Sequence, residues 1–138
     1  MLKNLMRTAL LVVCFVPAVM YGQGPAGAPS DLLKAMDAWA TAIDKADVSA
    51  WERLTTRRWT AVNASGHLVT REERIAELKQ MKPADTPSTC GSDRVTVFAG
   101  GNAATRRCLT DGNWRLEVWT KSGENWEVVA VQVTAAAK

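Results

Sequence analysis

Histidine and cysteine are scarce in this sequence, and their scarcity limits the chemistry that the chain can carry. There is one histidine, His67, and there are three cysteines among 138 residues. A protein-bound zinc ion usually takes three or four ligands from residues of these kinds. Cys90, Cys108 and a distant His67 cannot supply such a set, so we expect no metal site and no cofactor. No grouping of a nucleophile with a base is visible either.

The sequence also lacks an apolar run long enough to cross a membrane. Residues 9–16 are apolar, follow Lys3 and Arg7, and precede Pro17 and several glycines, whereas a spanning helix needs roughly 20 apolar residues. This pattern is typical of a Sec-type signal peptide. We expect residues 1–22 to be removed, with cleavage somewhere between residues 22 and 28, and an uncleaved anchor is the alternative. The mature protein would be periplasmic or secreted, without stable membrane insertion.

An excess of charge of one sign is missing once the expected leader is set aside. The whole chain carries a net charge of +3 from 17 basic and 14 acidic residues. Lys3 and Arg7 lie in the leader, which contains no acidic residue, so about +1 remains. Nucleic-acid binders usually show a concentrated basic surface. We therefore expect no nucleic-acid partner.

Export affects how the two remaining cysteines are interpreted, because disulfides persist outside the cytoplasm. Cys90 and Cys108 flank a candidate hairpin that turns at Gly100 and Gly101. Centring the turn there places residue 90 opposite Asp111, so a bulge or a longer loop must absorb an offset of three residues. We expect a Cys90–Cys108 disulfide, and two free buried thiols are the alternative.

The front of the mature chain has the spacing of helices. Apolar residues recur every three or four positions from Leu32 to Ile43, which predicts one buried stripe on a helix of residues 30–46. Ser30 is the expected N-cap of this helix. Asp47 is suited to cap a second, shorter helix.

A short strand and a third helix are expected next. Residues 58–63 alternate in polarity as a strand does, and residues 68–69 form a short return strand. Thr70 and Glu73 form a capping box that opens the third helix. The loop at residues 83–91 contains two prolines and is the expected mobile connection.

The back half of the chain predicts four strands, at residues 94–98, 103–110, 114–120 and 126–133. If Lys121 pairs with Asn125, each face of the second hairpin can be assigned. One face carries Trp114, Leu116, Val118, Val128, Ala130 and Gln132. The other face carries Arg115, Glu117, Trp119, Glu127, Val129, Val131 and Val133. Both faces are then largely apolar. We expect helices on one face and a second subunit or a long loop on the other.

Several segments together resemble one known family. The resemblance covers residues 30–138, and its motifs are Asp37-Ala38-Trp39 with Ala42, Asp47, Trp59 to Asn63 with Gly66, Thr70 to Glu73, Val118 to Lys121 with Gly123, and Trp126 to Thr134. In this order they resemble the SnoaL-like, DUF4440 branch of the nuclear transport factor 2-like (NTF2-like) superfamily.

The resemblance implies an α+β fold shaped like a cone. Three N-terminal helices would pack on a curved antiparallel β-sheet, with a pocket at the open end and a homodimer formed through the outer face of the sheet. Enzymes of the superfamily, such as ketosteroid isomerase, scytalone dehydratase and polyketide cyclases, place an aspartate or a histidine in this pocket as the general acid or base. Many other members bind or assemble without a known reaction, so membership does not decide catalysis.

Candidate catalytic residues are weak in this chain. Asn63 lies near the position where isomerase-like relatives carry their catalytic aspartate, and an amide cannot take up a proton at neutral pH. His67 follows a turn, where exposure is the simpler expectation. Asp37 is expected at the solvated edge of the first helix. Asp37 and His67 remain the only acid–base candidates, and whether the protein is an enzyme stays open.

Candidate binding residues come mainly from the tryptophans, of which there are six. Indole rings commonly line pockets for flat apolar molecules, although the same rings also fill cores. We expect Trp39, Trp59 and Gln132 to line a pocket, with Asn63 at its rim. The leading hypothesis is a binding domain for a small, largely apolar ligand. The alternatives are a small isomerase, dehydratase or cyclase, and a dimeric assembly module with a filled cone.

Overall fold

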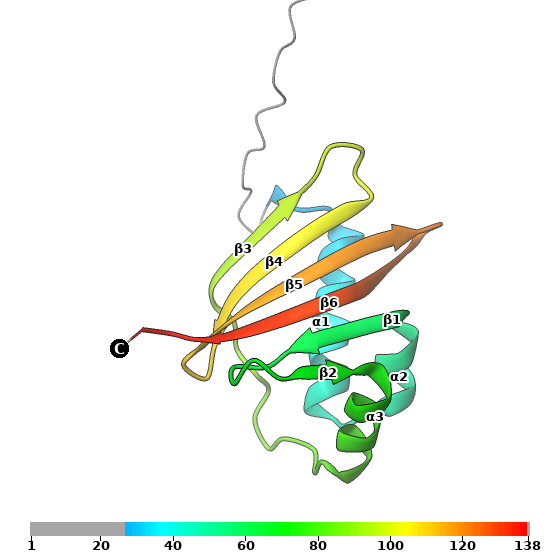
Figure 1. Cartoon of the computed structure of the whole chain (residues 1–138). Helices are drawn as coiled ribbons and strands as arrows, with labels where there is room; N and C mark the ends of the chain where they lie inside the picture. Colours follow the sequence, from blue (N-terminus) through cyan, green and yellow to red (C-terminus); the bar gives the residue numbers. More distant parts are fainter. Residues whose placement is uncertain (1–26, 138) are drawn as a thin grey trace, which may run out of the picture.

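The computed structural model describes residues 27–137. The expected signal peptide lies outside this range. The described elements are α1 (Ser30–Asp44), α2 (Val48–Arg53), β1 (Thr55–Val62), β2 (Leu68–Thr70), α3 (Arg71–Gln80), β3 (Gly91–Val97), β4 (Ala103–Thr110), β5 (Asn113–Ser122) and β6 (Asn125–Ala135). Figure 1 shows all three helices on one side of a single curved sheet. No helix within residues 27–137 is both long and apolar enough to span a bilayer.

Helix α1 buries the apolar stripe that its spacing predicts. Its buried residues are Leu32, Met36, Trp39 and Ala42. The N-cap is Pro29, and no side chain caps this end. The prediction of Ser30 as N-cap was wrong by one position, because Pro29 already holds the extended backbone that precedes a first turn.

The capping signals of the other two helices are confirmed. The carboxylate of Asp47 accepts a hydrogen bond from the Ala50 backbone N–H at 2.9 Å. Thr70 and Glu73 form the full capping box at the start of α3. Helix α3 follows β1 and β2, however, so only two helices precede the sheet. The prediction of three N-terminal helices was wrong in this respect.

The sheet has six strands in the order β2-β1-β6-β5-β4-β3. Four of its five neighbouring pairs are antiparallel, but β1 runs parallel to β6. A wholly antiparallel sheet was therefore the wrong expectation. The parallel pair arises because the chain passes through α3 and three more strands before β6 returns beside β1.

The β5–β6 hairpin turns one residue later than the sequence predicted. Ser122 pairs with Asn125 across a turn in which Gly123 has a φ of 62°, a conformation that suits glycine. A register shift then leaves Val129 as an extra residue in β6. As a result Trp126 and Val128 are buried with Trp119, while Val131 remains buried as predicted.

The core lies between the helices and the inner face of the sheet. Trp39 meets Trp119 edge to face, with ring centroids 6.1 Å apart, and Trp51 meets Trp59 at 4.9 Å. Such pairs add directional contacts to the burial of large apolar surfaces. The opposite face of the sheet leaves Leu116 and Val118 exposed.

Candidate functional site

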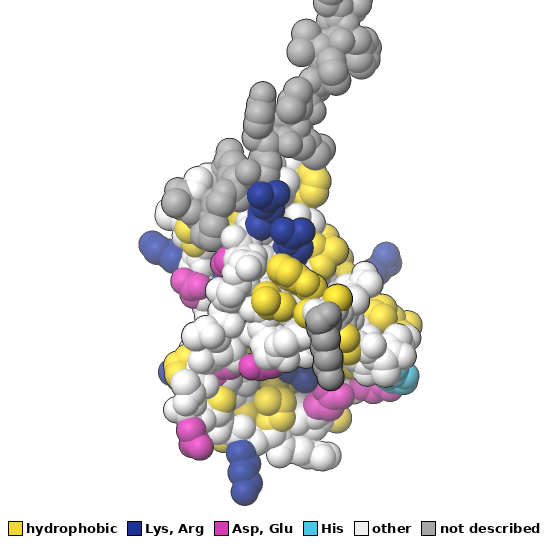
Figure 2. All heavy atoms as spheres, turned by 90° about the vertical axis from the view of Figure 1, so that its left-hand side faces the viewer, with side chains coloured by type: hydrophobic (Ala, Val, Ile, Leu, Met, Phe, Trp, Pro, Cys, Tyr) yellow, Lys and Arg dark blue, Asp and Glu magenta, His cyan; other side chains and the backbone are white. Residues whose placement is uncertain are grey.

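A cavity of about 290 Å³ opens between α1, α3 and the inner face of the sheet. This volume is at the lower end of the usual range for ligand pockets, about 300–1,000 Å³. Figure 2 views the molecule from the side on which the cavity opens and shows a hollow with hydrophobic side chains inside and acidic side chains at its margin. The lining residues are Trp39, Ile43, Trp59, Ala61, Val62, Asn63, Val69, Arg74, Glu77, Thr110, Asp111, Asn113, Arg115, Val131 and Val133.

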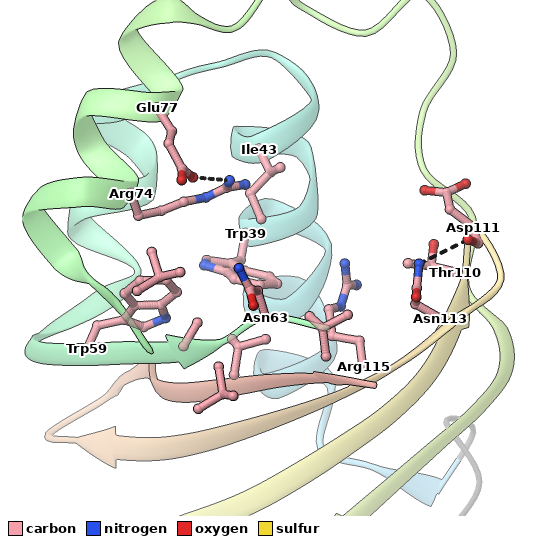
Figure 3. Close-up of a pocket in the computed structure, with 15 residues that line it drawn as sticks. Trp39, Ile43, Trp59, Asn63, Arg74, Glu77, Thr110, Asp111, Asn113 and Arg115 are labelled. Carbon is pink, nitrogen blue, oxygen red and sulfur yellow. Dashed lines mark hydrogen bonds and ion pairs between the residues drawn. The ribbon is translucent and has the colours of Figure 1, made fainter. Parts of the chain in front are cut away.

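Two tryptophans selected from the sequence form part of this wall. Trp39 is 2% exposed and Trp59 is 3% exposed, and they come from α1 and β1 (Figure 3). The indole Nε1 atoms of both are buried and have no hydrogen-bond acceptor. A buried donor without a partner costs free energy. The two rings therefore give the cavity flat apolar surface, and their N–H groups are buried behind it.

Asn63 also lines the cavity, directly after the end of β1. Its Oδ1 accepts hydrogen bonds from the backbone N–H of Ser65, the Ser65 hydroxyl and the backbone N–H of His67, at 3.1, 2.7 and 3.0 Å. Those bonds fix the turn before β2 and use the carbonyl end of the amide. The Nδ2 group donates to no described residue, which makes Asn63 a half-buried donor at this edge.

Arg115 is a lining residue that the sequence analysis did not select. It projects from β5 with its guanidinium 5.4 Å from the ring centre of Trp39. Its Nε atom lies 2.8 Å from Oε1 of Glu117, in an ion pair whose N–H is not well aligned with the oxygen. Nη2 has only the Cys108 sulfur as a partner, at 4.0 Å. Among residues 27–137, neither Nη1 nor Nη2 donates to an oxygen atom.

The inner face of the sheet holds a network of charged groups behind the cavity. Glu117 is fully buried, and its other oxygen accepts from Trp119 Nε1 at 3.0 Å. Arg106, on β4, donates twice to Asp93, at 2.9 and 2.7 Å. Burial raises the pKa of Glu117 although Arg115 and Arg106 oppose the effect. Burial alone would lower the pKa of Arg106, but the bond to Asp93 and the charges of Glu117, Asp93 and Asp37 raise it.

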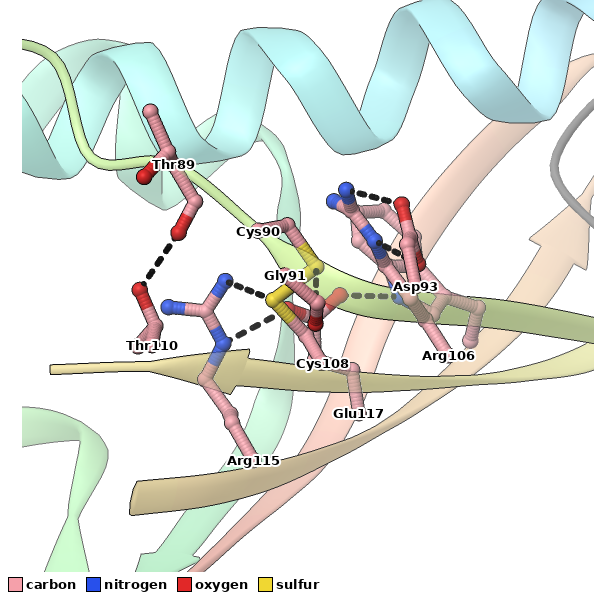
Figure 4. Close-up of a disulfide and its surroundings, with 10 residues drawn as sticks. Thr89, Cys90, Gly91, Asp93, Arg106, Cys108, Thr110, Arg115 and Glu117 are labelled. Atoms are coloured by element: carbon pink, nitrogen blue, oxygen red, sulfur yellow. Dashed lines mark hydrogen bonds and ion pairs between the residues drawn. A yellow bond between two sulfur atoms is a disulfide. The ribbon is translucent and has the colours of Figure 1, made fainter. Parts of the chain in front are cut away.

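The predicted disulfide joins Cys90 and Cys108, with Cα atoms 5.4 Å apart. A register shift between Gly91 and Arg94 absorbs part of the offset expected from the turn. Figure 4 shows the two sulfur atoms beside the Arg115 side chain. The bond therefore secures the start of β3 against the strand that lies next to Arg115.

The loop before β3 is tied to the rest of the domain, although it has no regular structure. The Ser88 backbone N–H donates to the Asp44 carboxylate at 2.9 Å, and Ala84 N–H donates to the Asp44 carbonyl at 2.7 Å. Thr110 donates to the Thr89 carbonyl at 2.8 Å. These bonds hold the loop from the end of α1 to the β4–β5 turn.

The rim of the cavity carries polar groups of both signs. Arg74 and Glu77, on α3, form an ion pair at 2.9 Å. Asp111 and Gly112 both have positive φ values, 49° and 71°, as in the two-residue turns that join antiparallel strands. This turn places Asp111 in water and leaves Asn113 half-buried beside it.

The remaining candidate residues lie away from the cavity. Gln132 is exposed on the outer face of the sheet, where it pairs with Leu116 of β5. Its expected burial was wrong, because Gln132 is on the same face as Leu116 and Val118, and no element within residues 27–137 covers that face. His67 and Asp37 are exposed and do not line the cavity. The structure thus brings Trp39, Trp59 and Asn63 together and adds Arg115.

No family model and no curated protein matches this sequence. Solved structures do match the fold. An NTF2-like protein from Cytophaga hutchinsonii is 23% identical, with a TM-score of 0.64 over 75% of this chain and 94% of that chain. An NTF2-like protein of unknown function in nutrient uptake from Rhodospirillum rubrum is 17% identical, with a TM-score of 0.64 over 78% and 99%. The association domain of CaMKII from C. elegans is 19% identical, with a TM-score of 0.66 over 76% and 93%.

The chain therefore has the NTF2-like fold, a mixed α+β architecture with a curved, open six-stranded sheet. The expectation drawn from the sequence motifs is confirmed at the level of the fold. Identities below 25% show the fold alone, and one fold can carry many activities. The function has to be argued from the cavity.

Proposed function

We propose that this domain binds a small, largely apolar ligand in the cavity between α1, α3 and the sheet, without covalent chemistry. The observation that supports the proposal best is the aromatic wall formed by Trp39 and Trp59 around about 290 Å³ of space. A filled cone, as an assembly module alone would have, leaves no such space. Flat apolar ligands gain most of their affinity from surfaces of this kind.

The positions of the acid–base candidates favour binding over an isomerase-like reaction. Proton transfer requires a catalytic group within hydrogen-bond reach of the substrate. Asp37 and His67 are exposed outside the cavity, and Glu117 lies behind Arg115 rather than in the lining. Of the carboxylates that line the cavity, Glu77 is engaged by Arg74 and Asp111 is exposed in the β4–β5 turn.

A titration with indole tests the proposal. We expect indole to shift backbone amide signals of the lining residues in nuclear magnetic resonance spectra of the isotope-labelled protein. Val133→Phe should block this response, because Val133 lines the cavity and the larger ring occupies its volume. Val118→Phe makes the same change on the exposed outer face and should leave the response intact. If neither indole nor naphthalene shifted the lining signals, the proposal would be wrong.

We also propose that the protein is exported and that it belongs to the SnoaL-like, DUF4440 branch of the superfamily. The basic and apolar pattern of residues 1–22 supports export, and so does the Cys90–Cys108 disulfide, which is stable in an oxidising compartment. The assignment to the branch depends on the motifs from Asp37 to Thr134. The mature protein would then act in the periplasm or outside the cell.

A homodimer formed through the outer face of the sheet is our proposal for the assembly. Leu116 is 40% exposed and Val118 is 36% exposed, and both border a shallow hollow of about 170 Å³ together with Ala130 and Gln132. Exposed apolar patches of this kind often mark interfaces. The association domain of CaMKII, which has the same fold, is consistent with assembly through this fold.

A further inference from the structure

The inner wall of the cavity offers hydrogen-bond donors without partners. Nη1 and Nη2 of Arg115 and Nδ2 of Asn63 have no oxygen acceptor within residues 27–137. Arg115 comes from β5 and Asn63 follows β1, and Figure 3 shows both side chains beside the Trp39 ring. A ligand that meets this wall is favoured when it brings acceptor atoms.

Arg115 is the strongest of these donors, because it is charged and only partly exposed. Its side chain is 16% exposed. Hydrogen bonds from a guanidinium to a carboxylate are charge-assisted and frequently bidentate, which adds both energy and directional selectivity. The low exposure of the site reduces competition from water. The Trp39 ring beside the guanidinium provides an apolar surface next to the charge.

Glu117 explains why the end of the arginine remains available. Its Oε1 lies 2.8 Å from Nε of Arg115, so it holds the side chain by the inner nitrogen. Its Oε2 is occupied by the Trp119 indole. Glu117 is fully buried and absent from the cavity lining. It therefore acts as a positioning residue that leaves both terminal nitrogens of Arg115 unpaired.

The neighbouring charges do not occupy those nitrogens either. Asp93 is engaged by two bonds from Arg106, and Glu77 is engaged by Arg74. Asp111 is the other acidic group on the rim, and it is exposed. Repulsion from a solvated charge is weakened by water and salt. The terminal nitrogens of Arg115 thus have no carboxylate partner among residues 27–137.

We infer that the cavity selects a small, flat molecule that carries a carboxylate, with Arg115 binding the carboxylate and Trp39 and Trp59 contacting the apolar body. The inference rests on the proposed binding function and adds the chemical class of the ligand. The ligand is apolar over most of its surface and acidic at one end. Asn63 contributes a further donor at the edge of the cavity.

Matched probes that differ in one group test this inference. Indole-3-carboxylate and indole-3-carboxamide have nearly the same shape, and only the first is an anion at neutral pH. In isothermal titration calorimetry we expect the acid to bind at least about tenfold more tightly than the amide, as charge-assisted hydrogen bonds predict. Arg115→Gln should abolish this preference and leave the affinity for the amide within about twofold. Arg107→Gln is the matched control, because Arg107 is exposed and stacks on Trp114 outside the cavity.

Each outcome distinguishes this inference from the proposed function. Equal affinities for acid and amide, with indole still bound in the cavity, would overturn the inference and leave the binding function standing. A preference for the acid that survives Arg115→Gln would overturn the role of Arg115. Failure of indole, the acid and the amide to bind would overturn both. If Arg115→Gln does not fold, the side-chain Nε–H signal of Arg115 in the wild-type protein decides: it must shift with the acid and stay unchanged with the amide.

Discussion

Glu117 is the only fully buried carboxyl group among residues 27–137. The groups facing it are Arg115 on its own strand, Arg106 on β4 and the indole of Trp119. Asp93 and Asp37 in turn raise the pKa of Arg106. A buried ionisable group couples its protonation to folding, because its pKa differs between the folded and unfolded chains.

The raised pKa of Glu117 gives a pH dependence of known sign. A folded carboxyl whose pKa exceeds the unfolded value, 4.5, holds its proton more tightly than the unfolded chain does. Its contribution to stability is fully present below about pH 4.5 and is lost as the pH rises through the folded pKa. Glu117→Gln should remove this pH-dependent loss of stability. In urea titrations, the difference in unfolding free energy between wild type and variant should therefore change as the pH rises above about 4.5. A constant difference from pH 4 to pH 8 would contradict the assignment.

Single residues also show where sequence reasoning succeeded and where it did not. Trp39 and Trp59 could be placed in a wall because large flat side chains at those positions must face the interior. Arg115 and Glu117 were correctly assigned to one face of their strand, together with Trp119. Their role was missed because a charged residue on a strand gives no signal of burial unless its partner is known.

At the level of elements, the Cys90–Cys108 bond is the main covalent constraint on the β3 edge. It closes a loop with a sequence separation of 18 residues. Removing it with Cys90→Ala and Cys108→Ala together should lower the free energy of unfolding by about 3 kcal/mol, since the unfolded chain gains freedom. Equilibrium urea denaturation measures the change.

The wild-type protein under reducing conditions is the control for this prediction, because it loses the bond and keeps both side chains. It should approach the stability of the double variant. Unchanged stability in both experiments would show that the bond does not stabilise the edge.

Elements differed in how well the sequence predicted them. The caps at Asp47 and Thr70 were predictable, because they depend on residues three positions apart. The register of β5 and β6 was not, because the extra residue Val129 is accommodated by the packing of Trp126 and Val128 on the core. The loop before β3 was expected to be mobile, yet it is tied down by Asp44 and Thr110, which are distant in sequence.

At the scale of the whole molecule, the outer face of the sheet determines the expected assembly. We expect the protein to be a dimer in sedimentation-velocity experiments, and Leu116→Glu to make it a monomer by burying a charge at the centre of the interface. Met81→Glu is the control, because Met81 is an exposed apolar residue at the end of α3, off the sheet. A monomeric wild type, or a dimeric Leu116→Glu variant, would contradict the proposed interface.

The architecture was predictable in outline because helical and strand periodicities occur in separate blocks of the chain. The strand order was less accessible, since the parallel pairing of β1 with β6 joins segments about 70 residues apart, and no local pattern encodes such a contact.

The parallel pairing of β1 with β6 also determines when the two parts of the sheet can join during folding. The hairpin of β1 and β2 joins the other strands only through β6, the last strand to be synthesised. Helices α2 and α3 pack on this hairpin, and β6 is needed to bring that unit beside the other strands. A chain that lacks β6 would therefore keep the β1–β2 hairpin and the β3–β5 strands without a backbone ladder between them.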